Sequence, residues 1–221
     1  MYEVENRAQD PAGVVWDALR SECDWAHADV VDVGCGDGFH LPVFAATARS
    51  VIGVEPHAPL LARARARTGD LPAVAVLLGD AEHLPLPEAS VDLVHARTAY
   101  FFGRGAEPGL AEAERVVRPG GAIAVVDLDA RCSPYGDWML ADLPRYDPVD
   151  VERFFAEQGF GCRKVVAEWR FERRADLEAV LGIEFSRQVA GRAIAATPGL
   201  TVAVGYRIHV RRRPTGLVLS R

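Results

Sequence analysis

The amino-acid sequence predicts an α/β fold, in which a mainly parallel sheet is covered by helices on both faces. Short apolar, β-branched segments alternate with helical segments along the first 130 residues, which is typical of right-handed crossovers between parallel strands. The segment VVDV at 30–33 is apolar except for one aspartate, as strands buried on both faces usually are. A chain of 221 residues is also long enough for one large core. We therefore expect a single domain over residues 1–221.

The first 130 residues contain signals for five strands with helices between them. Asp10 is a suitable N-cap and Pro11 a suitable first residue for a helix that runs to about Cys23. After the strand at 30–33 we expect a glycine-rich turn and a helix to about residue 48. The remaining elements expected here are strands at 51–54, 73–78, 91–96 and 122–128, a helix from Pro59 and a helix from Pro108 to Val117. The segment 118–121, RPGG, is expected to end that last helix and to form a turn.

The last 90 residues have a looser pattern. Residues 131–146 contain proline, glycine and aromatic side chains without a clear helical or strand period. Asp147 and Pro148 then open a helix as its N-cap and first residue. Strands are expected at 164–171 and 201–210, with helical signals between them at 175–181 and 186–195.

Composition excludes several classes of protein. The formal net charge of −6 argues against a nucleic-acid binder, because phosphate contacts need a basic face. Four scattered cysteines without a C-x-x-C pair indicate neither a disulfide framework nor a zinc site, so no metal is expected. No apolar segment approaches the ~18 residues of a membrane helix, and the polar N-terminus is unlike a signal peptide. These features predict a cytoplasmic protein.

The charge is unevenly distributed along the chain. Residues 1–130 carry a balance of −10, whereas residues 131–221 carry a balance of +4. The run of three arginines at 211–213 lies beside the last expected strand, and we interpret it as a solvated edge.

Residues suited to ligand binding first appear directly after the strand at 30–33. Gly34, Gly36 and Gly38 form a turn between that strand and a helix, where a ligand can approach the backbone because no Cβ atoms block it. The dinucleotide fingerprint G-x-G-x-x-G places its third glycine one position later. Asp32 precedes the first glycine and suits donor or cationic groups of a ligand better than a diphosphate.

Acidic residues also end the next two strands. Glu55 ends the second strand, where a carboxylate can accept two hydrogen bonds from a ribose diol. Asp80 ends the third strand and can accept a bond from an exocyclic amine, while the next backbone N–H can reach an adenine ring nitrogen. Because the carboxyl ends of parallel strands meet at one edge of the sheet, these acids and Asp32 surround the crevice where open α/β sheets bind ligands.

Four segments in this order and spacing resemble the class I S-adenosylmethionine (SAM)-dependent methyltransferases, in the small-molecule branch that includes the ubiquinone and menaquinone methyltransferases (methyltransferase type 11). The matching segments are VVDVGCGDG (30–38), VIGVEPHAPLLARAR (51–65), LLGDAEHLPLPEASVDLV (77–94) and ERVVRPGGAIAVVD (114–127). The resemblance implies a Rossmann-like seven-stranded sheet of order 3-2-1-4-5-7-6, with the last strand antiparallel. It also implies SAM as cofactor, with S-adenosylhomocysteine (SAH) as product.

The resemblance further implies how the chain is organised and which residues contact the cofactor. We expect an N-terminal helical segment (1–28), a cofactor-binding half (29–130) and a substrate-side half (131–221) with a helical insert at about 174–200. The glycine turn would border the methionine part of SAM, Glu55 would bind the ribose, and the backbone after the fourth strand would face the sulfonium. The expected cofactor-binding residues are Asp32, Gly34, Cys35, Gly36, Gly38, Glu55, Pro56, Asp80, Ala81, Ala96 and Arg97.

The catalytic group is not identified by the sequence. Methyl transfer from a sulfonium is an in-line displacement that mainly needs alignment and desolvation, and a base is needed only when the nucleophile carries a proton of high pKa. His95 and Tyr100 are weak candidates for such a base, and Arg97 is a candidate partner for a carboxylate of the substrate or of the cofactor. We expect a small, apolar or aromatic acceptor, bound near Phe101, Phe102, Tyr135 and Trp138.

Two other functions remain open at this point. An NAD(P)-dependent Rossmann oxidoreductase would share the sheet, and a non-catalytic homologue would keep only the cofactor pocket. RNA methylation lacks support because no catalytic motif of that class is present. The expected partners are a small molecule, with no nucleic acid and no membrane span, and the protein is expected to be a monomer or homodimer.

Overall fold

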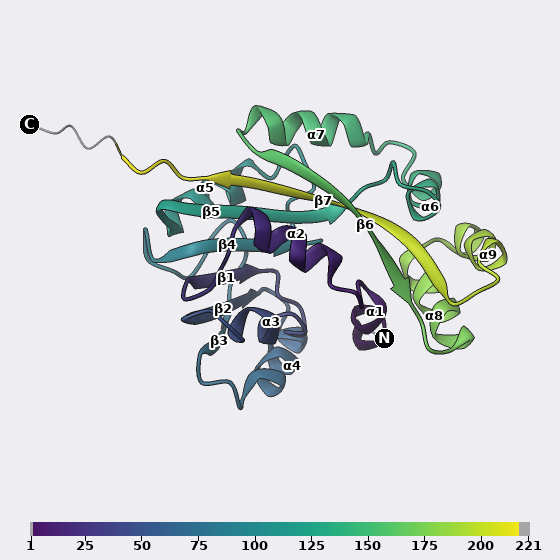
Figure 1. The fold of residues 1–221 in the computed structure, drawn as a ribbon, viewed down its shortest axis with the longest axis horizontal. Coiled ribbons are helices and arrows are strands. Elements are labelled where there is room, and N and C mark those ends of the chain that lie inside the picture. Colours follow the sequence, from purple (N-terminus) through teal and green to yellow (C-terminus); the bar gives the residue numbers. More distant parts are fainter. Residues whose placement is uncertain (1, 217–221) are drawn as a thin grey trace, which may run out of the picture.

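The computed structural model describes residues 2–216, which are built around one seven-stranded sheet (Figure 1). The strand order is β3-β2-β1-β4-β5-β7-β6, and β7 runs antiparallel to both of its neighbours. This confirms the predicted α/β class, strand order and direction of the last strand. The strands are β1 (Asp29–Val33), β2 (Ser50–Glu55), β3 (Val74–Leu78), β4 (Val91–Arg97), β5 (Val117–Leu128), β6 (Gly161–Arg170) and β7 (Thr201–Arg212).

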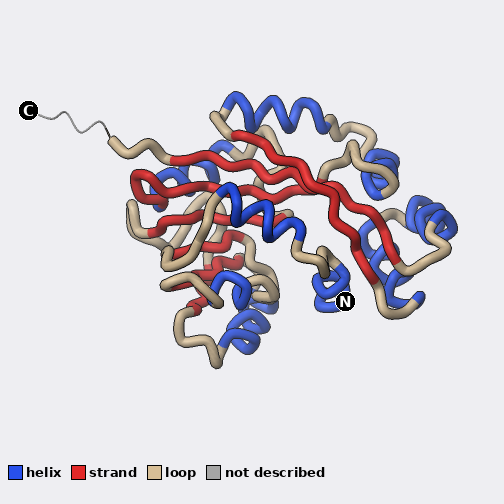
Figure 2. Tube along the Cα trace, viewed as in Figure 1, coloured by secondary structure: helices blue, strands red, loops and turns tan. Residues whose placement is uncertain are grey.

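Helices cover both faces of the sheet (Figure 2). Two separate buried clusters show this, since one contains Trp25, Phe44 and Trp169 and the other contains Leu110 and Phe154. The helices are α1 (Tyr2–Ala8), α2 (Val14–Glu22), α3 (Leu41–Ala45), α4 (Ala58–Thr68), α5 (Glu107–Val116), α6 (Tyr135–Asp142), α7 (Pro148–Glu157), α8 (Arg174–Glu184) and α9 (Arg187–Ala196). Figure 1 shows β6 and β7 extending past the other strands, with α8 and α9 at that end.

The N-terminal segment differs from the prediction. The helix expected from Pro11 begins at Val14 as α2, and a separate helix, α1, precedes it. The N-cap of α2 is Gly13 rather than Asp10, but the two carboxylate oxygens of Asp10 accept hydrogen bonds from the backbone N–H groups of Val14 and Val15 at 2.7 and 2.8 Å. The predicted N-cap and the first turn of the helix were therefore both placed three residues too early, although Asp10 does bind the first turn.

Two further elements were predicted incorrectly. Residues 135–142, which have no clear period, form α6. The segment 118–121 was expected to be a turn, but it belongs to β5, which begins at Val117 and pairs there with Val91 across a register shift. Gly120 adopts a φ of +86° in this stretch, so its backbone freedom lets the strand pass through the irregularity.

Ion pairs join the acidic and basic parts of the chain. Arg211 binds Glu114 with a distance of 2.8 Å between Nη2 and Oε2, and Arg163 lies 3.4 Å from Glu22. Arg213 donates hydrogen bonds to backbone carbonyls next to α5. The arginine run at 211–213 is therefore not a purely solvated edge, because it ties β7 to the first 130 residues.

No helix within residues 2–216 is both long enough and apolar enough to cross a membrane.

Candidate cofactor site

A cavity of about 370 Å³ lies where the predicted glycine turn and strand ends meet. Its wall is formed by the segments that follow β1, β2, β3 and β4, and by one side of α1. The lining residues are Glu5, Asn6, Gln9, Val33, Gly34, Cys35, Gly36, Asp37, Phe39, His40, Glu55, Pro56, Leu60, Gly79, Asp80, Ala81, Arg97, Thr98, Ala99 and Tyr100. Most of the predicted cofactor-binding residues therefore lie together around one cavity.

Glycine is required for different structural reasons at the three positions of the turn. All three have positive φ, at +72° for Gly34, +59° for Gly36 and +78° for Gly38. A Cβ on Gly34 would lie 2.5 Å from the Cβ of Ala99, and one on Gly38 would lie 3.0 Å from the Cα of Ala64. A Cβ on Gly36 would meet no protein atom within 4 Å. Packing thus requires glycine at 34 and 38, whereas Gly36 leaves free space beside the cavity.

Glu55 connects β2 to the glycine turn. Its Oε2 accepts a hydrogen bond from the backbone N–H of Gly36 at 2.9 Å, and its Oε1 accepts one from His57 at 2.8 Å. The side chain is buried, and each carboxylate oxygen keeps a second lone pair for another donor. Glu55 is therefore fixed in one orientation while it can still accept bonds from a ligand.

Asp80 is more exposed and is held through one oxygen. Its Oδ1 accepts hydrogen bonds from the backbone N–H groups of Glu82 and His83, both at 2.9 Å. These bonds form a turn after β3, with Ala81 next to it in the cavity wall. The turn orients the carboxylate of Asp80 at the cavity wall, next to the strand end that carries Glu55.

Asp32, Gly38 and Ala96 do not line the cavity, although they lie next to residues that do. Asp32 is buried, and its Oδ1 lies 2.7 Å from Nδ1 of His95 on the neighbouring strand. His95 has no exposed surface and packs against Phe44 and Trp16. This pair holds β1 and β4 together behind the glycine turn, which leaves His95 out of reach of a substrate.

Tyr100 lines the cavity, and its hydroxyl donates a hydrogen bond to Glu82 at 2.8 Å. Burial and this bond raise the pKa of Tyr100 above its usual value, which disfavours the tyrosinate that a base would need. Thr98 and Tyr100 both have positive φ, at +46° and +52°. Such strain in non-glycine residues is often found at ligand sites.

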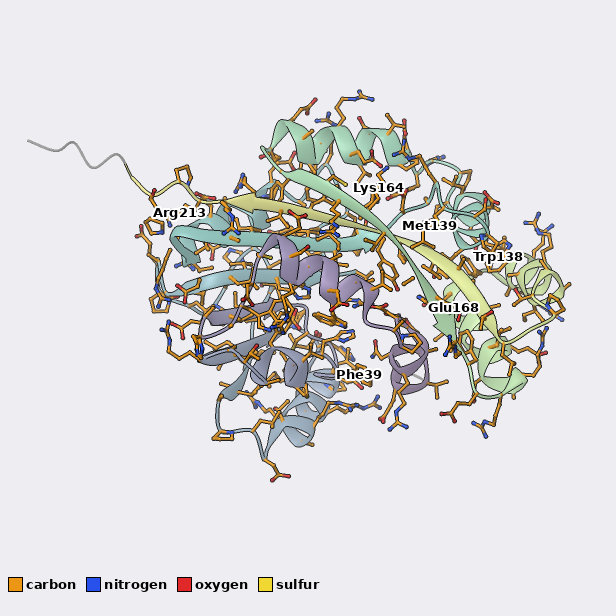
Figure 3. All side chains as sticks on the ribbon, viewed as in Figure 1. Phe39, Trp138, Met139, Lys164, Glu168 and Arg213 are labelled. Carbon is orange, nitrogen blue, oxygen red and sulfur yellow. The ribbon has the colours of Figure 1, made fainter. Side chains whose placement is uncertain are left out.

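The structure places the predicted acceptor residues away from this cavity. Phe101 is buried against Tyr100 in the second core cluster, and Phe102 is 53% exposed. Tyr135 and Trp138 pack in the other core cluster, and Figure 3 shows Trp138 on the other side of α1 from Phe39. Tyr135 lines a separate cavity of about 380 Å³ with Leu128, Met139, Asp142, Leu143, Glu184, Phe185 and Ser186.

Helix α1 forms one wall of the cavity, although none of its residues was predicted to contact the cofactor. Glu5, Asn6 and Gln9 line the cavity, and Arg67 of α4 holds α1 in place through ion pairs to Glu3 at 3.3 Å and to Asp37 of the glycine turn at 3.0 Å. The only sequence signal was a short run with glutamates and an arginine at helical spacing, which does not show where the helix docks.

Glu5 faces a second acid across this wall. Burial, and then the charge of Glu184 on α8, raise the pKa of Glu5 to about 7, while a hydrogen bond from Gln9 opposes the shift. The hydroxyl of Tyr135 donates to Glu184 at 2.5 Å. Glu184 lines the second cavity and Glu5 lines the first, so the charge of a residue at one cavity affects a group at the other.

Comparisons with known proteins indicate the family of this chain. The family described as "Methyltransferase domain" matches residues 31–125. A "probable S-adenosylmethionine-dependent methyltransferase" of Mycolicibacterium smegmatis is 37% identical over 191 residues, which cover 84% of this chain and 71% of that protein. A malonyl-[acyl-carrier protein] O-methyltransferase of Pseudescherichia vulneris is 28% identical over 192 residues, with 86% and 70% covered.

Several other curated relatives match over shorter stretches, and this chain spans only 28% to 46% of their lengths. Among solved structures, a SAM-dependent methyltransferase from Aquifex aeolicus is similar with a TM-score of 0.59 and 17% identity, over 92% of this chain and 95% of that one. The [4+2]-cyclase SpnF has a TM-score of 0.63 and 20% identity, over 91% and 81%. At these sequence identities, the two structural similarities show a shared fold and nothing more.

The predicted family resemblance is thus confirmed, and the oxidoreductase alternative is rejected. The strand order of the sheet and the match to the Mycolicibacterium smegmatis protein over most of both chains identify the same family. The chain belongs to the class I S-adenosylmethionine-dependent methyltransferases.

Proposed function

We propose that the cavity beside the glycine turn binds SAM, and that the protein transfers the methyl group of SAM to a small-molecule acceptor. The observation that carries this proposal is the position of Glu55 and Asp80 at adjacent strand ends on one cavity. Gly36, which has no side chain to fill the space there, lies between them and the end of β4. The cavity volume of about 370 Å³ is within the usual range of small-molecule sites.

The residues present suit the parts of SAM. Glu55 would accept hydrogen bonds from the ribose hydroxyls, because its orientation is fixed by two backbone N–H groups. Asp80 and the backbone of Ala81 would bind the adenine, with Pro56 and Leu60 as apolar neighbours in the wall. Asp32, Gly38 and Ala96 would act indirectly, by holding the turn and the strand ends in place.

The chemistry that bound SAM supplies is an activated methyl group on a sulfonium leaving group. The protein's own contribution is alignment and exclusion of water, and neither His95 nor Tyr100 is suited to act as a base. His95 is buried and paired with Asp32, and Tyr100 has a raised pKa. An acceptor that is already nucleophilic at neutral pH would need neither of them.

The acceptor is expected to be apolar or aromatic outside its reacting group. The second cavity supports this expectation, since Leu128, Tyr135, Met139 and Phe185 contribute to its wall. Glu184 also lines this second cavity, and its charge acts on Glu5, which lines the first. The malonyl thioester named for the Pseudescherichia vulneris relative is one acceptor that combines a nucleophilic group with a longer chain.

Calorimetric titration with SAH tests the cofactor site. Wild-type protein should bind SAH, and Glu55→Ala and Asp80→Ala should each weaken binding at least tenfold, because each removes acceptors for the nucleoside. Asp150→Ala, an exposed acid of α7, is the matched control and should bind like wild type. Unchanged affinity in both cavity variants would reject the site assignment.

Transfer of labelled methyl from SAM into an extract of small metabolites tests catalysis itself. We expect labelled product with wild-type protein and none with Glu55→Ala. If SAH binds well and no label is transferred under any condition, the protein is a cofactor-binding homologue without methyl transfer.

A further inference from the structure

We propose that Arg97 is the receptor for a carboxylate at the β4 end of the cavity, supplied either by the amino-acid part of SAM or by the acceptor. This inference rests on the proposed function, because it assigns a partner within the same cavity. Glu55 and Asp80 lie on β2 and after β3, whereas Arg97 ends β4, on the other side of β1. The guanidinium is therefore at the opposite end of the cavity from the two acids assigned to the nucleoside.

Arg97 is buried without a counter-charge. The residue is only 8% exposed, and its single hydrogen bond to a side chain runs from Nη2 to Oε1 of Gln9 at 3.1 Å. Its Nε and Nη1 groups have no acceptor, and within residues 2–216 no carboxylate lies within 4 Å of it. A buried cation without an anionic partner is unfavourable. A ligand carboxylate would supply that partner, because it can accept two N–H groups of one guanidinium at once.

Two aromatic rings fix the position of the guanidinium. Its Cζ lies 5.5 Å from the ring centre of Trp16 on α2 and 5.2 Å from that of Tyr206 on β7. Tyr206 is held in turn by a hydrogen bond from Nε1 of Trp169 at 2.7 Å. Such stacking limits the rotation of the arginine, so its free N–H groups are oriented before a ligand arrives.

The neighbouring groups leave room for an anion. His40 also lines the cavity, and burial and then the charge of Arg97 hold the pKa of His40 well below its usual range, so its ring is neutral. Its Nδ1 has no partner within the described residues. Gln9 lies between Arg97 and Glu5, because it donates to Glu5 at 3.0 Å and accepts from Arg97. The nearest acid on α1 is thus bonded to Gln9 rather than to the guanidinium.

A carboxylate acceptor would also need no base to activate it. In that case one carboxylate oxygen forms a bond to the methyl carbon as the carbon–sulfur bond breaks, and the electron pair of that bond remains on sulfur. The products are a methyl ester and SAH, and no proton has to be removed from the nucleophile.

Two ligands distinguish the sources of the carboxylate. SAH carries the carboxylate of SAM, whereas 5′-deoxy-5′-(3-aminopropylthio)adenosine is the same molecule without it. If the carboxylate comes from the cofactor, wild-type protein should bind SAH at least tenfold more tightly than this analogue. The variant Arg97→Gln should lose that difference while it keeps its affinity for the analogue. The wild-type comparison measures the contribution of the carboxylate to binding, and the variant assigns that contribution to Arg97.

Benzoate and hexanoate, titrated into protein saturated with SAH, test the acceptor as the source. Binding that is at least tenfold weaker in Arg97→Gln, with SAH affinity unchanged, would assign Arg97 to the acceptor. Arg20→Gln is the matched control, because Arg20 also stacks on a tryptophan, Trp25, at 4.2 Å but does not line the cavity. It should behave like wild type with every ligand.

The inference is overturned if wild-type protein binds SAH and the analogue equally and neither acid binds in a way that depends on Arg97. That outcome leaves the proposed function intact, because SAH still binds. Failure of wild-type protein to bind SAH at all would instead reject the proposed function.

Discussion

Two buried arginines lie near the carboxyl end of the central strands, and their surroundings differ. Arg207 on β7 is fully buried and binds Asp127 of β5 at 2.6 Å and the hydroxyl of Tyr146 at 2.5 Å. Arg97 on β4 is nearly as buried, but among residues 2–216 it has Gln9 as its one side-chain hydrogen-bond partner. Arg207 packs next to Pro148 at the start of α7, whereas Arg97 packs against Trp16 of α2.

The difference separates a structural cation from one suited to a ligand. A buried guanidinium is stable when a carboxylate and further acceptors surround it, which the chain provides for Arg207. The chain provides rings and an amide for Arg97, which orient the group without neutralising it. Arg207 is therefore neutralised within the fold, whereas Arg97 is left with N–H groups that a ligand can bind.

The largest expected effect concerns the buried ion pair between Arg207 and Asp127. Asp127→Ala leaves Arg207 buried without its carboxylate, so the free energy of unfolding should fall by about 3–5 kcal/mol. Arg97→Met is the matched comparison and should change it by less than about 1 kcal/mol, because one hydrogen bond is lost and no acid is stranded. Urea denaturation of both variants measures the difference. Equal losses would show that Arg97 is as structural as Arg207.

The glycine turn offers a comparison within the cavity itself. Gly34→Ala should destabilise the fold by about 2–4 kcal/mol, since the new Cβ meets Ala99 at 2.5 Å and the residue has positive φ. Gly36→Ala should cost about 1–2 kcal/mol, because only the backbone strain applies, yet it should weaken SAH binding. Denaturation and calorimetry on both variants test this. A Gly36→Ala protein that binds SAH normally would contradict a ligand position beside Gly36.

The ionisation of His209 and of Glu5 should change the stability of the protein with pH in opposite directions. Burial, and then the charge of Arg207, lower the pKa of His209 to about 4. The unfolded chain therefore binds a proton there that the folded chain does not, and stability should fall by about 2–3 kcal/mol as the pH decreases from 6.5 to 4. The pKa of Glu5 is raised to about 7, so between pH 4.5 and 7 the folded chain binds a proton there that the unfolded chain does not. Stability is therefore lost as the pH rises from about 4.5 to 7.

Thermal unfolding between pH 4 and 8 measures both dependences. His209→Phe should flatten the acid side, because a phenyl ring can keep the stacking on Phe155, whose ring centre lies 4.1 Å away. Glu5→Gln should remove the loss of stability between pH 4.5 and 7, because an amide does not ionise there, and should leave the contribution of His209 unchanged. If neither variant alters the profile, other groups control it.

Local signals made the sheet and most of the cavity predictable from the sequence. Strands such as 30–33 are short and apolar, and Glu55 and Asp80 follow their strands directly, so the topology alone brings them together. The pairing of Asp32 with His95 was also accessible, because β1 and β4 are neighbours in the predicted order and these residues are in register.

Tertiary contacts were not accessible in the same way. Aromatic residues such as Tyr135 and Trp138 indicate burial but not which cavity they line, and they pack around Phe185 instead. The docking of α1 depends on Arg67, which lies 64 residues from Glu3. The missing counter-charge of Arg97 is a property of everything that surrounds it, so no single segment could reveal it.

The stacking of Arg97 on Trp16 also gives the protein an intrinsic optical probe. Indole emission responds to charges near its ring, and a carboxylate that binds Arg97 would change the charge 5.5 Å from Trp16. Trp25, Trp138 and Trp169 are at least nine-tenths buried, and they provide a constant background that a Trp16→Phe variant would isolate. Occupancy of the site can therefore be followed by fluorescence in unlabelled protein.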